Sequence, residues 1–136
     1  MIKNYFYLVV GVFCLLFAVT HTINGVNTIL EELDNSLIVD DAKVAFTYVW
    51  HIIGIENLIF GIALIIMAFQ KSLSKARFAA WLIIIILALR WIAISAFTLV
   101  NSSGGISRIL PDTVAIFVVI TLLILGTRGR DKVLYE

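Results

Sequence analysis

The sequence predicts an all-α, polytopic membrane protein whose four transmembrane helices form an up-down bundle. Of its 136 residues, 62% are hydrophobic and 14% are charged, whereas soluble domains are about 45–50% apolar and about 25% charged. The apolar residues gather in four runs, each near the roughly 20 residues that a helix needs to cross the hydrocarbon core. None of the runs alternates with a period of two, as the strands of a membrane barrel do, and only helices and closed barrels satisfy their backbone in lipid.

The expected helices belong to a single transmembrane domain that fills residues 1–136. The first apolar run continues past the length of a signal peptide and has no small-residue cleavage site, so we expect it to be retained. Pro111, the only proline, is placed in the first turn of the fourth helix, where proline is tolerated. The four helices are expected at approximately residues 4–33, 42–70, 74–100 and 111–127.

Lysine and arginine concentrate on the side that holds both termini and the second connection. The basic residues of the second connection and of the C-terminal tail are Lys71, Lys75, Arg77, Arg128, Arg130 and Lys132. The opposite side has only Lys43 and Arg108, an acidic first connection and a turn at residues 101–105. The positive-inside rule therefore predicts that both termini are cytoplasmic, in a bacterial-type inner membrane or a plasma membrane.

Ionisable residues inside the apolar runs mark the candidate site, because a charge in hydrocarbon is costly unless it has a partner or water. Counting at 1.5 Å per residue from the charged ends of each helix puts Glu56 of the second helix and Arg90 of the third near the bilayer centre. An acid and a guanidinium at one depth are expected to form an intramembrane ion pair, since either alone would be unpaired.

A second tier of polar residues is expected outward of this pair. The same count places His21 and His51 at a similar depth, with Asn24, Tyr48 and Asp112 expected on the outer side of them. The two tiers together predict a buried polar pocket in the outer half of the bundle.

The favoured function is binding of a small or lipid-like ligand in that pocket, with transformation or translocation of the ligand left open. Arg90 would hold a negative or polar group, and Glu56 and the histidines would exchange protons, because burial readily shifts their pKa values. The candidates for a catalytic role are His51, Glu56 and Arg90, and the ligand-binding set is His21, Asn24, Tyr48, His51, Glu56, Arg90 and Asp112.

Two alternatives stay open. In the first, His21 and His51 are the two axial ligands of a haem in a cytochrome-b-like bundle; no other metal site is expected. In the second, the protein is an accessory subunit without chemistry, and its charges only specify which helices pair.

The expected partners are the lipid bilayer, the ligand and a second copy of the chain. Gly54, Asn57 and Gly61 lie on one face of the second helix, where small residues let another backbone approach, either within the chain or across an oligomer. The single cysteine, Cys14, excludes an intramolecular disulfide, and the absence of a basic tract argues against nucleic acid.

Overall fold

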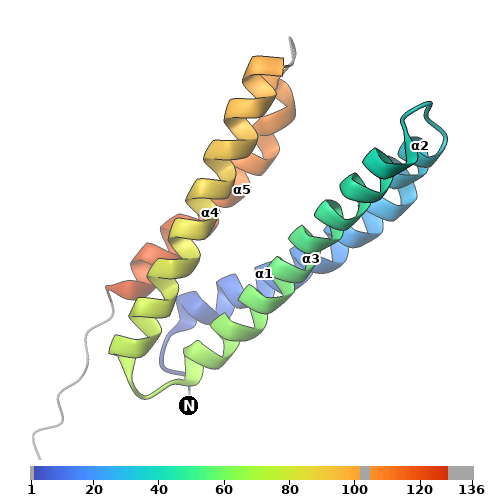
Figure 1. Cartoon of the computed structure of the whole chain (residues 1–136). Coiled ribbons are helices and arrows are strands. Elements are labelled where there is room, and N and C mark those ends of the chain that lie inside the picture. Colours follow the sequence, from blue (N-terminus) through green and yellow to red (C-terminus); the bar gives the residue numbers. More distant parts are fainter. Residues whose placement is uncertain (1, 102–104, 129–136) are drawn as a thin grey trace, which may run out of the picture. The chain divides into compact units, whose positions relative to one another are not determined.

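A computed structural model of the chain describes residues 2–101 and 105–128. Within these ranges every regular element is a helix, and no strand occurs, which confirms the all-α prediction (Figure 1). The elements are α1 (Tyr5–Asn24), the π-helical turn η1 (Gly25–Ile29), α2 (Leu30–Asp34), α3 (Asp40–Phe69), α4 (Leu73–Asn101) and α5 (Gly105–Thr127).

Four of the described helical stretches are long and apolar enough to cross a membrane. They are Tyr5–Asp34, which comprises α1, η1 and α2, then Asp40–Phe69, Ser74–Asn101 and Ile109–Thr127. The protein is therefore a multi-pass membrane protein by the length and composition of its helices. The cytoplasmic position of the termini and the up-down arrangement remain predictions.

The fourth helix begins earlier than expected, at Gly105, so that Pro111 lies inside α5. Asn101 ends α4 and Gly105 starts α5. Residues 102–104 of the expected turn lie outside the described residues, as do Arg130 and Lys132. Proline removes one backbone hydrogen bond, but transmembrane helices tolerate this loss because neighbouring groups satisfy the freed carbonyl. The proline therefore does not mark the helix start here.

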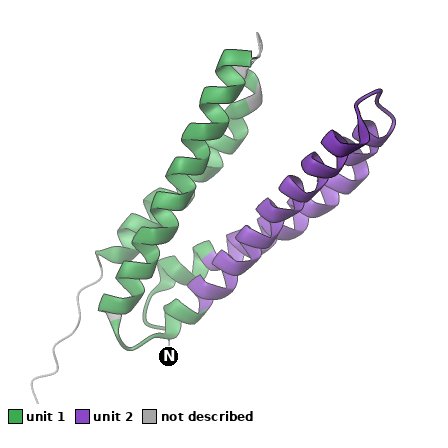
Figure 2. Ribbon diagram, viewed as in Figure 1, with its two compact units in different colours: residues 1–10, 66–136 green, residues 11–65 purple. Residues whose placement is uncertain are grey.

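The chain divides into two compact units (Figure 2). Unit 1 comprises residues 1–10 and 66–136, and unit 2 comprises residues 11–65. Both α1 and α3 contribute to each unit.

Unit 2 is built around an antiparallel pair of helices, α1 and α3, whose backbones come close together at two glycines. A Cβ atom on Gly61 would lie 2.9 Å from the carbonyl oxygen of Gly11, and a Cβ on Gly11 would lie 3.0 Å from the carbonyl oxygen of Gly61. Farther along, Gly54 faces Thr22, whose Oγ1 would lie 2.9 Å from an added Cβ. The glycines are needed because only a residue without a side chain lets the two backbones come this close.

In unit 1, α4 and α5 are held together by an aromatic and hydrogen-bonded contact. The indole Nε1 of Trp91 donates to Oγ1 of Thr113 at 3.0 Å. The same indole packs edge-to-face against Phe117, with ring centroids 5.2 Å apart. Aromatic pairs favour this geometry. The buried residues of this helix pair include Ala80, Ile83, Ile84, Leu87, Val119 and Leu123.

Three helix ends meet in unit 1 around Asn4. Its side-chain oxygen accepts a hydrogen bond from the backbone N–H of Tyr7 at 3.2 Å, which caps the first turn of α1. Its Nδ2 donates to the carbonyl of Gly126 near the end of α5 at 2.8 Å. The backbone N–H groups of Lys3 and Asn4 donate to the carbonyl of Ala68 near the end of α3, at 2.8 and 3.1 Å. One buried asparagine thus helps to satisfy groups that the ends of three helices would otherwise leave unpaired.

Tyr7 fills the space beside this junction and is only 1% exposed. Its ring lies against Gly126, where an added Cβ would lie 2.6 Å from Cε1 of the tyrosine. Its hydroxyl group has no hydrogen-bond partner among the described residues. The ring therefore contributes packing to the junction, and the hydroxyl contributes no hydrogen bond.

Candidate functional site

His21 of α1 and Trp50 of α3 form a reciprocal contact between the two helices of unit 2. The imidazole Nε2 of His21 lies 3.2 Å from the carbonyl oxygen of Trp50; because a carbonyl only accepts, this nitrogen is the donor. In return the indole Nε1 of Trp50 donates to the carbonyl of His21 at 3.2 Å. The two rings stack, with centroids 4.3 Å apart and planes 9° from parallel. Each polar ring is thereby bonded to the backbone of the other helix.

The π-helical turn η1 follows α1 shortly after His21. The N–H of Leu30 donates to the carbonyl of Gly25, five residues back, and the hydroxyl of Thr28 donates to the carbonyl of Asn24. Gly25 lies against the indole of Trp50, and an added Cβ there would overlap the ring. The glycine gives the indole room to reach the His21 carbonyl. π-helical turns of this kind occur frequently at functional sites.

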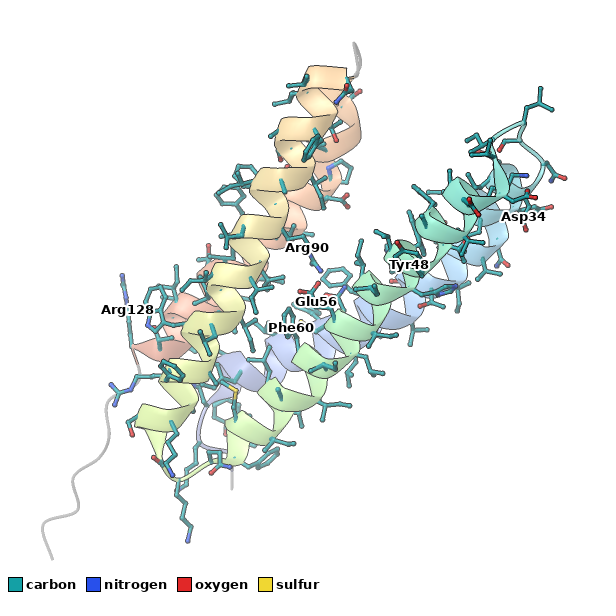
Figure 3. The ribbon with its side chains drawn as sticks, viewed as in Figure 1. Asp34, Tyr48, Glu56, Phe60, Arg90 and Arg128 are labelled. Carbon is teal, nitrogen blue, oxygen red and sulfur yellow. The ribbon has the colours of Figure 1, made fainter. Side chains whose placement is uncertain are left out.

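A groove runs along α3 on the half of unit 2 next to the connection between α2 and α3, and it contains two of the expected site residues, Tyr48 and His51. Its volume is about 430 Å³, and it is open to its surroundings. Figure 3 places Tyr48 on α3 and Asp34 at the end of unit 2 where the groove begins. The groove is lined by Asp34, Lys43, Val44, Thr47, Tyr48, His51, Ile52 and Ile55.

Hydrogen bonds fix the polar end of this groove. The ammonium group of Lys43 donates to the carbonyl of Asp34 at 2.8 Å, which ties the start of α3 to the end of α2. The hydroxyl of Thr47 donates to the carbonyl of Lys43 at 2.9 Å. Lysine has three N–H donors, so this backbone bond leaves donors that can face the groove.

The expected buried polar pocket is not present among the described residues, whose grooves are open at the surface. The physical reason is that polar groups of the apolar runs bond to the backbone. His21 bonds to Trp50, as described above, and Asn57 is buried with its Nδ2 donating to the carbonyl of Ile53, one turn earlier in its own helix, at 3.0 Å. A polar group bonded in this way has its partner already, so its presence in an apolar run does not require a polar cavity.

The remaining expected site residues lie on separate elements. Glu56 is half-buried on α3 in unit 2, and Arg90 is half-buried on α4 in unit 1 (Figure 3). Asp112 is exposed on α5 of unit 1, and Asn24 is exposed at the end of α1. The ion pair between Glu56 and Arg90 stays a prediction.

The haem alternative requires both imidazoles to face one iron. The Nε2 atom of His21 is bonded to the Trp50 carbonyl, and its ring is covered by the indole. His51, one residue after Trp50, lines the groove. The contacts of His21 therefore fit helix pairing better than iron ligation. Among the described residues, no group of three or more His, Cys, Asp and Glu side chains is placed to hold a metal ion.

The small-residue face that was considered for an oligomer contact packs within the chain. Gly61 lies against Gly11 and Leu15 of α1, and Gly54 lies against Thr22. The intrachain alternative thus holds for these glycines, because α1 occupies the surface that a second copy would need. Association through another surface stays a prediction.

Sequence reasoning missed Trp50 and Gly25 as partners of His21. A signal was available: His21 and Gly25 are one turn apart and share one helix face, and Trp50 lies one turn before Gly54. Matching the two small-residue faces would have brought the indole against Gly25.

Compared with protein-family models, curated proteins and solved structures, the chain shows no match.

Proposed function

We propose that the protein binds a single-chain or lipid-like amphiphile in the groove on α3. The observation that carries this proposal is the separation of polar and apolar lining along the helix. The polar lining residues lie toward the outer end of the groove with Val44 among them, and Ile52 and Ile55 lie at its deeper end. The polar residues are Asp34, Lys43, Thr47, Tyr48 and His51. This order matches a ligand with a polar head and an apolar chain.

The length of the groove supports the same class of ligand. The lining residues of α3 run from Lys43 to Ile55, a rise of about 18 Å at 1.5 Å per residue. Half of a bilayer's hydrocarbon core is about 15 Å thick. A groove that begins at the charged start of α3 therefore extends from the membrane interface to about mid-membrane, which is the depth range of one acyl chain.

The chemistry of the outer end indicates the headgroup. The ammonium of Lys43, the hydroxyl of Tyr48 and the imidazole of His51 can donate hydrogen bonds, whereas the carboxylate of Asp34 at the same end only accepts them. The fitting headgroup therefore combines acceptors for Lys43 with a donor for Asp34, as a protonated carboxyl group does. A charge-assisted bond from Lys43 would be the strongest of these contacts. In the orientation that we propose, with both termini cytoplasmic, the headgroup lies at the outer face.

Photolabelling of the purified full-length protein tests the proposal. The probe is a palmitic acid with a diazirine in its chain, applied in mild detergent and competed with unlabelled palmitic acid. We expect saturable labelling of residues along the groove. The Ile55→Trp substitution fills the deep end and should weaken labelling roughly tenfold, which is about 1.4 kcal/mol of binding free energy, because the indole occupies the space of the ligand's chain.

Ile62→Trp is the matched control, since Ile62 is on the same helix outside the lining and is 49% exposed, compared with 55% for Ile55. Labelling that is not saturable, or that falls equally in both variants, would indicate ordinary contact with lipid. That result would contradict the groove as a binding site and favour the accessory role.

A further inference from the structure

A set of basic residues surrounds the end of unit 1 where α1, α3 and α5 meet. We call it the basic collar: Lys3, Lys71, Lys75, Arg77 and Arg128. Arg77 is half-buried and the other four are exposed. The single acidic residue among those described in unit 1, Asp112, lies in the N-terminal half of α5, away from this end. The collar therefore has a strong net positive charge.

The hydrogen bonds of the junction gather the collar in one place. The N–H of Lys3 donates to the carbonyl of Ala68, shortly before Lys71, and Asn4 donates to the carbonyl of Gly126, shortly before Arg128. Lys75 and Arg77 follow in the first turns of α4. Because backbone carbonyls hold the chain segments together, the positive charges remain close without any anion bound.

Exposed aromatic side chains lie immediately beside the collar residues in unit 1. Phe78 is 69% exposed next to Arg77, and Tyr5 is 67% exposed two residues after Lys3. The full set is Tyr5, Phe6, Phe69, Phe78 and Trp81. Tyrosine and tryptophan are enriched where helices cross the boundary between hydrocarbon and headgroups, so Tyr5 and Trp81 indicate this boundary. They place the adjacent collar at the depth of the lipid phosphates.

We propose that the basic collar binds the headgroups of anionic phospholipids. Lysine offers a compact charge and arginine a planar fork of donors, and both suit phosphate oxygens. A basic residue close to an anionic membrane surface strengthens the attraction about fivefold, so several together give a marked preference over zwitterionic lipid. This site is in the other unit from the α3 groove and does not depend on the groove binding a ligand.

The test measures which lipids remain bound to the purified full-length protein. Protein in mild detergent is equilibrated with equal amounts of phosphatidylglycerol and phosphatidylcholine, and the retained lipids are counted by native mass spectrometry at low and high sodium chloride. We expect phosphatidylglycerol to be enriched and the enrichment to fall as salt rises. In the double variant Lys71→Gln with Lys75→Gln, the enrichment should fall by about fivefold for each charge removed.

The matched control is Lys71→Arg with Lys75→Arg, which conserves charge and should retain the enrichment. Circular dichroism and elution volume establish that both variants fold. Equal retention of the two lipids by the parent protein, or an unchanged enrichment in the Gln variant, would overturn the proposal. Displacement of the lipid by millimolar inorganic phosphate would also overturn it, since it would indicate a site for a free anion. The salt series of the parent protein decides the question even if the Gln variant does not fold.

Discussion

The close approach of α1 and α3 predicts that two neighbouring glycines of α3 differ sharply in their tolerance of alanine. An added Cβ on Gly61 would lie 2.9 Å from the carbonyl oxygen of Gly11 and 2.6 Å from Cδ2 of Leu15. The backbone oxygen cannot move without shifting α1. An added Cβ on Gly54 meets the Thr22 hydroxyl at 2.9 Å, and its next contact is at 3.9 Å. A threonine side chain has a second rotamer available in a helix.

The expected magnitudes follow from this difference. Replacing glycine by alanine inside a helix is favourable by about 1 kcal/mol through helix propensity alone. At Gly54 this gain offsets the rotation of Thr22, so the stability of the Gly54→Ala protein should be close to that of the parent. At Gly61 the overlap adds an overpacking cost of about 1–3 kcal/mol, and the shift of α1 also disturbs the packing at Gly11. We therefore expect Gly61→Ala to be less stable than Gly54→Ala by about 1–3 kcal/mol.

Cys14 provides the assay. It is the only cysteine of the chain, lies on α1 and is 2% exposed, so a fluorogenic maleimide reacts with it when the helices separate. The midpoint temperature of labelling in mild detergent should fall for Gly61→Ala and stay near the parent value for Gly54→Ala. Equal midpoints for the two variants would refute the close approach. A changed elution volume for Gly61→Ala with an unchanged midpoint would instead indicate a contact between two copies.

Two further predictions concern the helix junction and the expected ion pair. Asn4→Ala should lower the stability by about 1–3 kcal/mol because it removes a helix cap and the donor to a helix-end carbonyl. Tyr7→Phe should leave the stability unchanged, since the tyrosine hydroxyl has no partner among the described residues. Cys14 labelling measures both variants, and equal losses of stability would contradict the role of Asn4 as a cap. Glu56→Gln and Arg90→Met should each cost about 3–5 kcal/mol if the two side chains form a buried pair, and the double variant should cost much less than the sum. Additive losses would show that the two side chains do not interact.

The membrane-spanning helices could be predicted from the sequence because their cause is local. A run of about 20 apolar residues satisfies the backbone in lipid only as a helix, whatever surrounds it. The start of α5 was placed wrongly because Pro111 is a breaking signal in water but is tolerated within a membrane helix. The π-helical turn η1 could not be predicted from its own residues. It begins at Gly25, which lies against the indole of Trp50, and these two residues are far apart in the sequence.

The prediction of the candidate site rests mainly on depth, and depth does not fix the direction in which a side chain points. His21 and His51 were grouped by depth, yet successive residues of a helix are turned by about 100°. Trp50 faces α1 and bonds to His21, so His51, the next residue, is turned toward the flank and lines the groove. Tyr48 and His51 both line the groove, since a separation of three residues keeps two side chains on one face.

A polar residue in an apolar run is weak evidence for a pocket on its own, for a reason that unit 2 makes concrete. Hydrocarbon holds no water, so a polar side chain takes the nearest acceptor, and in a helical hairpin that acceptor is usually a main-chain carbonyl. Thr22 bonds to Ala18, and Asn57 bonds to Ile53, each one turn back in its own helix, while His21 bonds to the facing helix. Lys43 and Thr47 of the α3 groove also bond to main-chain carbonyls, but they lie near the charged end of the unit, where a headgroup can compete for their donors. The binding hypothesis therefore follows from the position of Lys43, Tyr48 and His51 around one groove, and the polarity of the apolar runs alone would not have supported it.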